Sequence, residues 1–287
     1  MEDLSFEVRR GEIFGLLGPN GAGKTTAMKM LMGFVAPTSG SAFIGSAKAG
    51  TLEARRNLGY LPENPALYEF LRGDEYMVFA GRLAGLSRGD AHTQAKILLE
   101  KVGLTGRADR PVRRFSKGMV QRLGIAQCLL GDPETVILDE PMSGLDPIGR
   151  KDVRDLILKL REEGRTVLFS THILSDVEAI CDRVGIIVAG RLTDCGALAD
   201  LVEPGARAVE LIVEKLPRIL EERFRSEGVP MLQRDRSLVL TFAEETKAQE
   251  ALRAALDAGA TVVSLTPHRR SLEELFVARA RGTATTS

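Results

Sequence analysis

The chain has 287 residues, of which 44% are hydrophobic, a length that allows one large domain or a large and a small one. Its formal net charge is zero and no basic stripe stands out, so the sequence gives no reason to expect a nucleic-acid partner. The three cysteines (Cys128, Cys181 and Cys195) form no C-x-x-C pair, which argues against a structural zinc or disulfide framework and fits a reducing cytosol.

The first part of the chain alternates between predicted strands and helices. Apolar residues at every second position predict a short strand over 4–8, and IFGLLG at 13–18 predicts a buried strand. AMKMLMGF at 27–34 has helical periodicity, and SGSAFIGS at 39–46 predicts another short strand between glycine turns. Residues 73–131 are helical in pattern and are interrupted by glycines.

Three apolar segments in the middle of the chain are typical of buried strands. They are TVILDE at 135–140, TVLFSTH at 166–172 and VGIIVAG at 184–190, and an amphipathic helix is predicted over 151–163. Strands that alternate with helices in this way predict a mainly parallel sheet covered on both faces, which is an α/β fold.

The pattern changes near Glu203-Pro204-Gly205. Beyond this point strands and helices alternate as β-α-β-α-β, and SLEELFVARA predicts a closing helix. We therefore predict a large domain over 1–202 with a helical subdomain at about 73–131, a small α+β accessory domain over 203–281, and a disordered tail over 282–287.

The segment GPNGAGKTT contains the pattern G-x-x-x-x-G-K-T between a predicted strand and a predicted helix. Such a pattern arises by accident in roughly one chain of this length in a hundred. Its backbone N–H groups would wrap a phosphate chain, Lys24 would reach the β- and γ-phosphates, and the Thr25 hydroxyl would bind Mg²⁺. The predicted nucleotide-binding residues are Gly18, Pro19, Asn20, Gly21, Ala22, Gly23, Lys24, Thr25 and Thr26.

The phosphate loop contains no carboxylate that could bind Mg²⁺ or activate a water. Polar residues at the ends of two predicted strands could do both. Asp139 would hold Mg²⁺ and Glu140 would activate an attacking water, the alternative being two solvated acids in a loop. His172 ends the next predicted strand, where it would contact the γ-phosphate; a lone histidine is otherwise more often structural.

A further turn lies in FSKGMVQRLGIAQCLL, which begins at Phe115. Ser116 is a suitable N-cap, Gly118 permits close approach to the backbone, and apolar periodicity predicts a helix that runs to Gly131. A helix N-terminus binds anions, although an ordinary capped helix would carry the same residues.

These motifs together resemble the nucleotide-binding subunit of an ABC transporter, over nearly all of residues 1–200. The ordered set is GPNGAGKTT, YLPEN, FSKGMVQRL, VILDE, SGLD and STH. The resemblance implies an ABC-type P-loop NTPase domain, mainly a parallel sheet with antiparallel and helical subdomains, which hydrolyses ATP with Mg²⁺. It makes Asp139 a residue that assists Mg²⁺, Glu140 the general base, Asp146 part of an inter-subunit loop, and His172 the γ-phosphate switch.

The same resemblance implies two partners. Ser116 and Gly118 match the serine and second glycine of the family signature, which in this family covers an ATP held on the phosphate loop of another subunit. Two partners are therefore expected: an integral membrane permease, and a second ABC ATPase subunit, which is a copy of this chain (a homodimer) or a paralogue. No signal peptide precedes the chain and no apolar run reaches roughly 18 residues, so we expect a chain that is soluble when isolated and is held at the cytoplasmic face of the membrane through the permease.

The sequence departs from the family pattern in three places. Lys117 and Met119 replace a glycine and a glutamine of the common signature, as in the branch that works with separate export permeases. Glu63 stands where the family has glutamine; its carboxylate can still bind Mg²⁺ or a water, but it adds negative charge near ATP. Met1 lies after the position of the family's adenine-stacking aromatic residue, so either the true start lies upstream or adenine is held loosely.

The function expected from these motifs is that of an ATPase subunit that drives an exporter. One alternative is a soluble ABC-type ATPase that acts on a macromolecular partner, although the coiled-coil inserts, zinc fingers and basic tails of such relatives are not seen. A P-loop GTPase would require an NKxD motif, which is also not seen. TPHRRSLEELF resembles the appendage of the export branch, and we favour a dimer-stabilising role for that domain. The transported substrate cannot be predicted, because the permease selects it.

Overall fold

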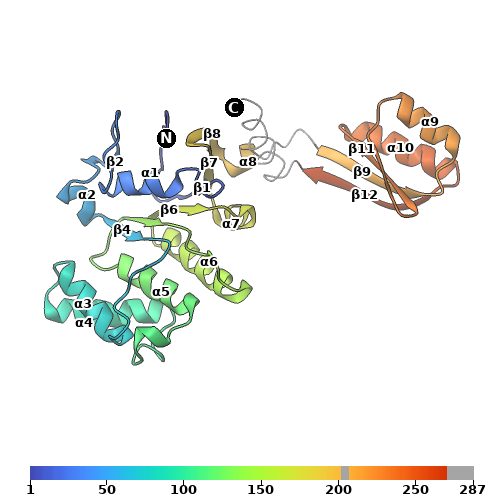
Figure 1. Ribbon diagram of the computed structural model, residues 1–287. Coiled ribbons are helices and arrows are strands. Elements are labelled where there is room, and N and C mark those ends of the chain that lie inside the picture. Colours follow the sequence, from blue (N-terminus) through green and yellow to red (C-terminus); the bar gives the residue numbers. More distant parts are fainter. Residues whose placement is uncertain (202–206, 270–287) are drawn as a thin grey trace. The chain divides into compact units, whose positions relative to one another are not determined.

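The computed structural model describes residues 1–201 and 207–269, and it divides into two compact units (Figure 1). The first unit is Met1–Leu198 and the second begins at Ala199, so the division falls inside the short helix α8 (Leu198–Leu201). The predicted boundary at 202/203, the predicted closing helix and the predicted tail at 282–287 lie outside the described residues. Each unit is described by itself.

A six-stranded mixed sheet forms the centre of the first unit. Its strand order is β4-β5-β6-β1-β7-β8, with the first five strands parallel and β8 antiparallel to β7. The predicted, mainly parallel α/β sheet is confirmed. The strands are β1 (Ile13–Leu17), β4 (Leu58–Leu61), β5 (Thr135–Leu138), β6 (Thr166–Thr171), β7 (Arg183–Val188) and β8 (Arg191–Ala197).

The strand register brings four carboxyl ends to one edge of this sheet. Leu61 pairs with Leu138, and Leu138 pairs with Phe169. Leu17 in turn pairs with Thr171. The segments that follow β4, β5, β6 and β1 therefore leave the sheet side by side, which is where ligands bind in open parallel sheets.

Helices cover both faces of the sheet, and Figure 1 shows α1 on one side and α5 and α6 on the other. Phe14 and Leu16 of β1 pack on α1 through Met28, whereas Ile13 belongs to the core on the opposite face. Alternate residues of one strand thus serve two cores, as strand geometry requires. The helices are α1 (Lys24–Leu31), α2 (Leu52–Arg56), α3 (Gly73–Leu83), α4 (Arg88–Lys101), η1 (Val112–Arg114), α5 (Lys117–Cys128), α6 (Pro147–Glu162) and α7 (Leu174–Ile180).

Glycines shape the segment that carries α3, α4 and α5. Gly85 and Gly103 follow α3 and α4 with φ of 90° and 68°, a left-handed conformation that ends each helix at little cost. Gly59 allows the end of α5 to approach β4, because a Cβ at this position would overlap the carbonyl of Cys128. This contact fixes α5 against the sheet.

The N-terminal segment differs from its prediction. Residues 4–8 alternate in polarity but join no ladder among the described strands. Leu4, Phe6 and Val8 instead pack on the core beneath α1, where the Phe6 ring stacks on Phe14 with centroids 5.3 Å apart. The predicted strand over 39–46 is present as part of a small hairpin of β2 (Phe43–Ile44) and β3 (Ala47–Lys48).

The second unit is a four-stranded antiparallel sheet with the order β10-β11-β9-β12. It contains one more strand than predicted, since the short, largely exposed MLQR segment forms β10 and makes the order of elements β-α-β-β-α-β. One core joins the sheet and its two helices. The elements are β9 (Arg207–Glu214), α9 (Arg218–Ser226), β10 (Met231–Arg234), β11 (Ser237–Phe242), α10 (Glu245–Asp257) and β12 (Thr261–Arg269).

Within the described ranges, no helix has the length and apolar character that a bilayer crossing needs.

Candidate functional site

The predicted phosphate loop connects the end of β1 to the start of α1. Gly18 is buried against β7, and a Cβ there would overlap the carbonyl of Ile187. Gly21 and Gly23 have φ of 79° and 107°, a region that side-chain-bearing residues rarely adopt. The loop leads directly into the N-terminus of α1. The N-terminus of a helix favours a bound anion.

Lys24 is the first residue of α1 and its side chain is only 6% exposed. Its ammonium donates hydrogen bonds to the carbonyl oxygens of Gly18 (2.6 Å) and Pro19 (3.2 Å). It also lies 3.1 Å from the Glu140 carboxylate, without hydrogen-bond geometry at that oxygen. The lysine is thus held in the mouth of the loop, where a phosphate chain would meet it.

Asp139 and Glu140 follow β5 and are tied to β6 by a serine. The Ser170 hydroxyl donates to Asp139 Oδ1 at 2.6 Å and accepts from the Glu140 backbone N–H at 2.8 Å. Both acids are buried, Asp139 at 1% exposure, and Glu140 has a φ of 48°. Sequence reasoning did not select Ser170, although it directly precedes the Thr-His of the STH motif that was quoted.

The Glu140 carboxylate lies between two cationic or potentially cationic groups. Its Oε1 faces Lys24, and its Oε2 is 2.9 Å from Nδ1 of the partly exposed His172. Lys24, Glu140 and His172, predicted from separate motifs, are therefore brought together at one edge of the sheet. A carboxylate in this position can accept a proton once water replaces one of these contacts.

The oxygen donors at this edge suit Mg²⁺. Thr25 is half-buried in the first turn of α1, Asp139 ends β5, and the exposed Glu63 follows β4, the neighbour of β5. Mg²⁺ is commonly bound by one or two carboxylates together with phosphate oxygens, which fits this set. Nearby, burial and, to a smaller extent, the charge of Asp139 raise the pKa of Tyr60 to about 12, so this phenol stays protonated.

Ser116, Gly118 and Asp146 lie together in a different place. They line a hollow of about 400 Å³ between the starts of α5 and α6. Ser116 caps α5 by accepting from the Met119 N–H (3.3 Å), and Asp146 caps α6 by accepting from the Gly149 N–H (2.7 Å).

The candidate site therefore has two separate halves in one chain. Over the described ranges, no hydrogen bond or ion pair joins the residues of this hollow to Lys24, Glu140 or His172. The exposed Lys117 also lines the hollow, where its amino group lies against Gly144.

A family model described as ABC transporter matches residues 1–143. The Bacillus subtilis "Uncharacterized ABC transporter ATP-binding protein YdbJ" is 37% identical over 286 residues, which cover 96% of this chain and 89% of that protein. This chain belongs to the ABC transporter ATP-binding protein family. Its fold is correspondingly the ABC-type P-loop NTPase fold, and the resemblance inferred from the motifs is confirmed.

Other relatives of this ABC family member match a shorter part of the chain. The chain spans 58% of an uncharacterized ABC transporter ATP-binding protein, sll0415, from Synechocystis, with 44% identity over 70% of its own length. The "Lantibiotic transport ATP-binding protein SrtF" of Streptococcus pyogenes is 41% identical over 67% of this chain and 82% of that protein. A solved "Structure of ATP binding subunit of ABC transporter" has 35% identity and a TM-score of 0.63 over 70% of this chain and 85% of that one.

The serine between the two acids gives a first prediction. Ser170→Ala removes the donor to Asp139 and the acceptor of the Glu140 N–H, so two buried polar groups lose a partner. We expect the free energy of unfolding to fall by about 1–3 kcal/mol, measured by urea denaturation followed by circular dichroism. Ser175→Ala, at an exposed position of α7, is the control and should change it by less than about 0.5 kcal/mol. Equal stability of the two variants would contradict the proposed role of Ser170.

Proposed function

We propose that this chain is the ATP-binding and ATP-hydrolysing subunit of an exporter and that it powers a separate membrane permease. The observation that carries the proposal is the convergence of Lys24, Glu140 and His172 at the mouth of a phosphate loop. The name of the related lantibiotic transport protein supports a role in transport. We infer a position at the cytoplasmic face of the membrane, through the permease.

In the proposed reaction, a water attacks the γ-phosphorus of ATP and the bond to the β–γ bridging oxygen breaks, which releases ADP. When ATP binds, the Lys24 ammonium leaves the Glu140 carboxylate and contacts the β- and γ-phosphates instead. Glu140, freed from the ammonium, accepts the proton of the attacking water, and His172 contacts the γ-phosphate. Thr25 and Asp139, with Glu63 close by, would hold Mg²⁺, which neutralises charge on the phosphates when bound.

The second half of the site requires a second subunit. Ser116, Gly118 and Asp146 form an anion-compatible hollow at two helix N-termini, yet they make no bond to the phosphate loop of their own chain. We propose that two subunits associate head to tail, so that each hollow covers an ATP on the other subunit's loop. The donors would then surround the γ-phosphate and stabilise the charge that develops during transfer.

The permease would contact the surface that follows Glu63. Tyr68 and Phe70 are 59% and 82% exposed, whereas Leu67 and Leu71 pack toward the core of the first unit. The Tyr68 ring packs edge to face against Phe79 of α3, with ring centroids 5.0 Å apart. Exposed aromatic side chains on a rigid support suit a groove for an amphipathic segment of a partner.

The general base gives the central prediction. Glu140→Gln keeps a hydrogen-bonding side chain but removes the proton acceptor, so ATP binding should persist while turnover falls by about 10²–10⁴-fold, measured by phosphate release. The nucleotide-bound dimer should accumulate in gel filtration. Lys24→Ala is the matched comparison and should weaken ATP binding itself in a titration. Turnover by Glu140→Gln near the native rate would exclude Glu140 as the base.

Complementation tests the two-subunit site. A Lys24→Ala chain and a Ser116→Arg chain should each be inactive alone. In a mixed dimer one site carries both lesions, and the other has an intact loop and an intact signature turn, so ATPase activity should return in part. If mixed dimers form without any recovery, the proposal that one intact site can work in trans is wrong.

Crosslinking tests the permease surface. Tyr68→Cys should form a crosslink with the cytoplasmic loops of the membrane protein that copurifies with this chain. A cysteine at Ile148, which is 74% exposed and borders the signature hollow, serves as the control and should not react with those loops. Crosslinks from position 148 but none from position 68 would contradict the assignment of this surface.

A further inference from the structure

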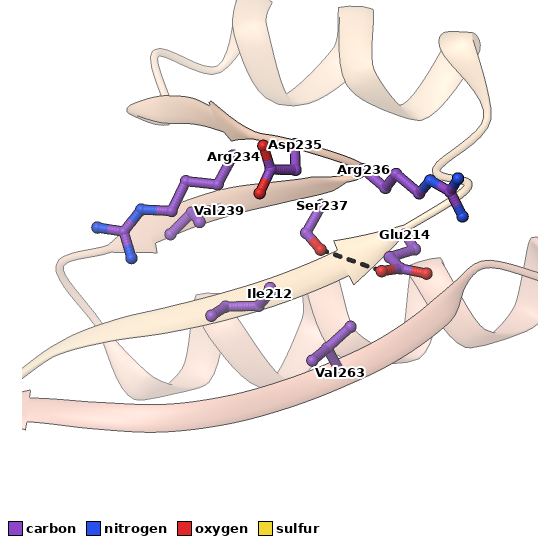
Figure 2. A pocket seen from close by; sticks show the side chains of 8 residues that line it. All are labelled: Ile212, Glu214, Arg234, Asp235, Arg236, Ser237, Val239 and Val263. Carbon is purple, nitrogen blue, oxygen red and sulfur yellow. Dashed lines mark hydrogen bonds between the residues drawn. The ribbon is translucent and has the colours of Figure 1, made fainter.

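Buried polar atoms that lack a hydrogen-bond partner are costly, so each of them calls for a physical reason. On the sheet face of the second unit in Figure 2, the Ser237 hydroxyl donates to the Glu214 carboxylate at 3.2 Å, and no side chain drawn there carries such an atom. In the first unit, two such atoms belong to the two members of one ion pair, Arg150 and Asp176.

This ion pair joins the starts of two helices that belong to different halves of the candidate site. Arg150 lies at the start of α6, where its backbone N–H donates to the carbonyl of Asp146 at 2.9 Å. Asp146 in turn lines the hollow at the starts of α5 and α6. Asp176 lies in the first turn of α7, four residues after His172. The pair therefore connects the hollow to the segment that carries the predicted γ-phosphate contact.

The contact between the two side chains has one hydrogen bond where it could have two. Nη2 of Arg150 donates to Oδ2 of Asp176 at 2.9 Å. Nε on the same edge of the guanidinium and Oδ1 of the same carboxylate are both buried, and neither has a partner within the described part of the chain. Arginine–carboxylate pairs are frequently bidentate, with two parallel N–H···O bonds. The two unpaired atoms are thus the donor and the acceptor of the missing second bond.

The pair has two discrete arrangements, with one bond or with two. The second bond would satisfy two buried polar atoms at once, and the Asp176 side chain, which is 1% exposed, depends on protein donors for that. Its formation requires a small shift between the start of α6 and the start of α7. His172 is bonded to the Glu140 carboxylate at 2.9 Å, and this contact holds the segment that leads into α7.

We propose that Arg150 and Asp176 are positioning residues whose second hydrogen bond forms when two subunits close on ATP. We rest this inference on the proposed head-to-tail pair, which it deepens. A second subunit that docks at Asp146 would shift the start of α6, and the second bond would carry this shift to α7 and His172. Docking at the hollow and the γ-phosphate contact of the same chain are thereby linked, and the linkage acts equally in both directions.

The missing hydrogen bond can be measured directly by nuclear magnetic resonance. The Glu140→Gln chain with isotope-labelled arginine is compared without nucleotide and as the dimer isolated with ATP and Mg²⁺. The Nε–H signal of Arg150 is assigned by its loss in a chain that also carries Arg150→Lys. We expect its exchange with water to slow about tenfold or more in the dimer, because Nε–H gains a buried acceptor. The Nε–H signal of Arg161, which bonds Asp182 through Nη1 on the same helix, is the internal control and should keep its exchange rate.

Two variants separate a positioning role from a purely structural one. Arg150→Lys keeps the charge and one bond but has no second parallel donor, so kcat should fall about tenfold or more at nearly unchanged KM for ATP. Arg161→Lys is the matched control and should keep the native kcat. The combined Arg150→Met and Asp176→Leu variant replaces the pair with apolar side chains, a change that often leaves stability near the native value. Its kcat should be low although urea denaturation shows a native-like midpoint.

The outcomes distinguish this inference from the ATPase proposal. Unchanged exchange at Nε–H of Arg150 in the ATP-bound dimer, or a native kcat in Arg150→Lys, would overturn the inference and leave the proposed function intact. If the combined variant does not fold, these two measurements decide alone. Failure of the Glu140→Gln chain to form any ATP-bound dimer would contradict the proposed two-subunit site and would overturn the inference with it.

Discussion

The buried contact between Lys24 and Glu140 is the constraint on which the arrangement of the first unit depends. Both side chains are less than 10% exposed, and removing one member of such a buried pair costs about 3–5 kcal/mol. The lysine enters from the start of α1 and the glutamate from the end of β5, with β6 between β5 and β1. The strand order and the glycines of the phosphate loop therefore both position the contact between Lys24 and Glu140. The proposed reaction requires this contact to break. In the proposed function, stability and catalysis would share this pair, because a phosphate chain is the anion that would take the place of the Glu140 carboxylate.

Much of this site could be predicted from the sequence, because each motif ends a segment whose apolar pattern is unambiguous. The carboxyl ends of buried parallel strands meet at one edge of the sheet. Asp139, Glu140 and His172 were therefore assigned to the same edge as the phosphate loop. Ser170 was not assigned, since its position in a strand ladder is visible only when β5 and β6 are paired. Strand β10 was missed because MLQR is short and exposed. Residues 4–8 were assigned to a strand by their alternation, yet alternation reports a half-buried segment and does not supply a neighbour to pair with.

The first unit offers two unlike surfaces. One is the phosphate loop with Asp139 and Glu140 beside it, and the other is the hollow at the starts of α5 and α6. In the proposed head-to-tail pair, each surface would complete the other on a second subunit, so that neither chain would form a complete site alone.

The serine between β5 and β6 has a mechanical consequence. Its hydroxyl holds the carboxylate of Asp139 and the backbone of Glu140 at once, so both acids are tied to the same point on the neighbouring strand. Shear between the two strands would displace both acids together. In the proposed function, metal binding by Asp139 and water activation by Glu140 would therefore change together.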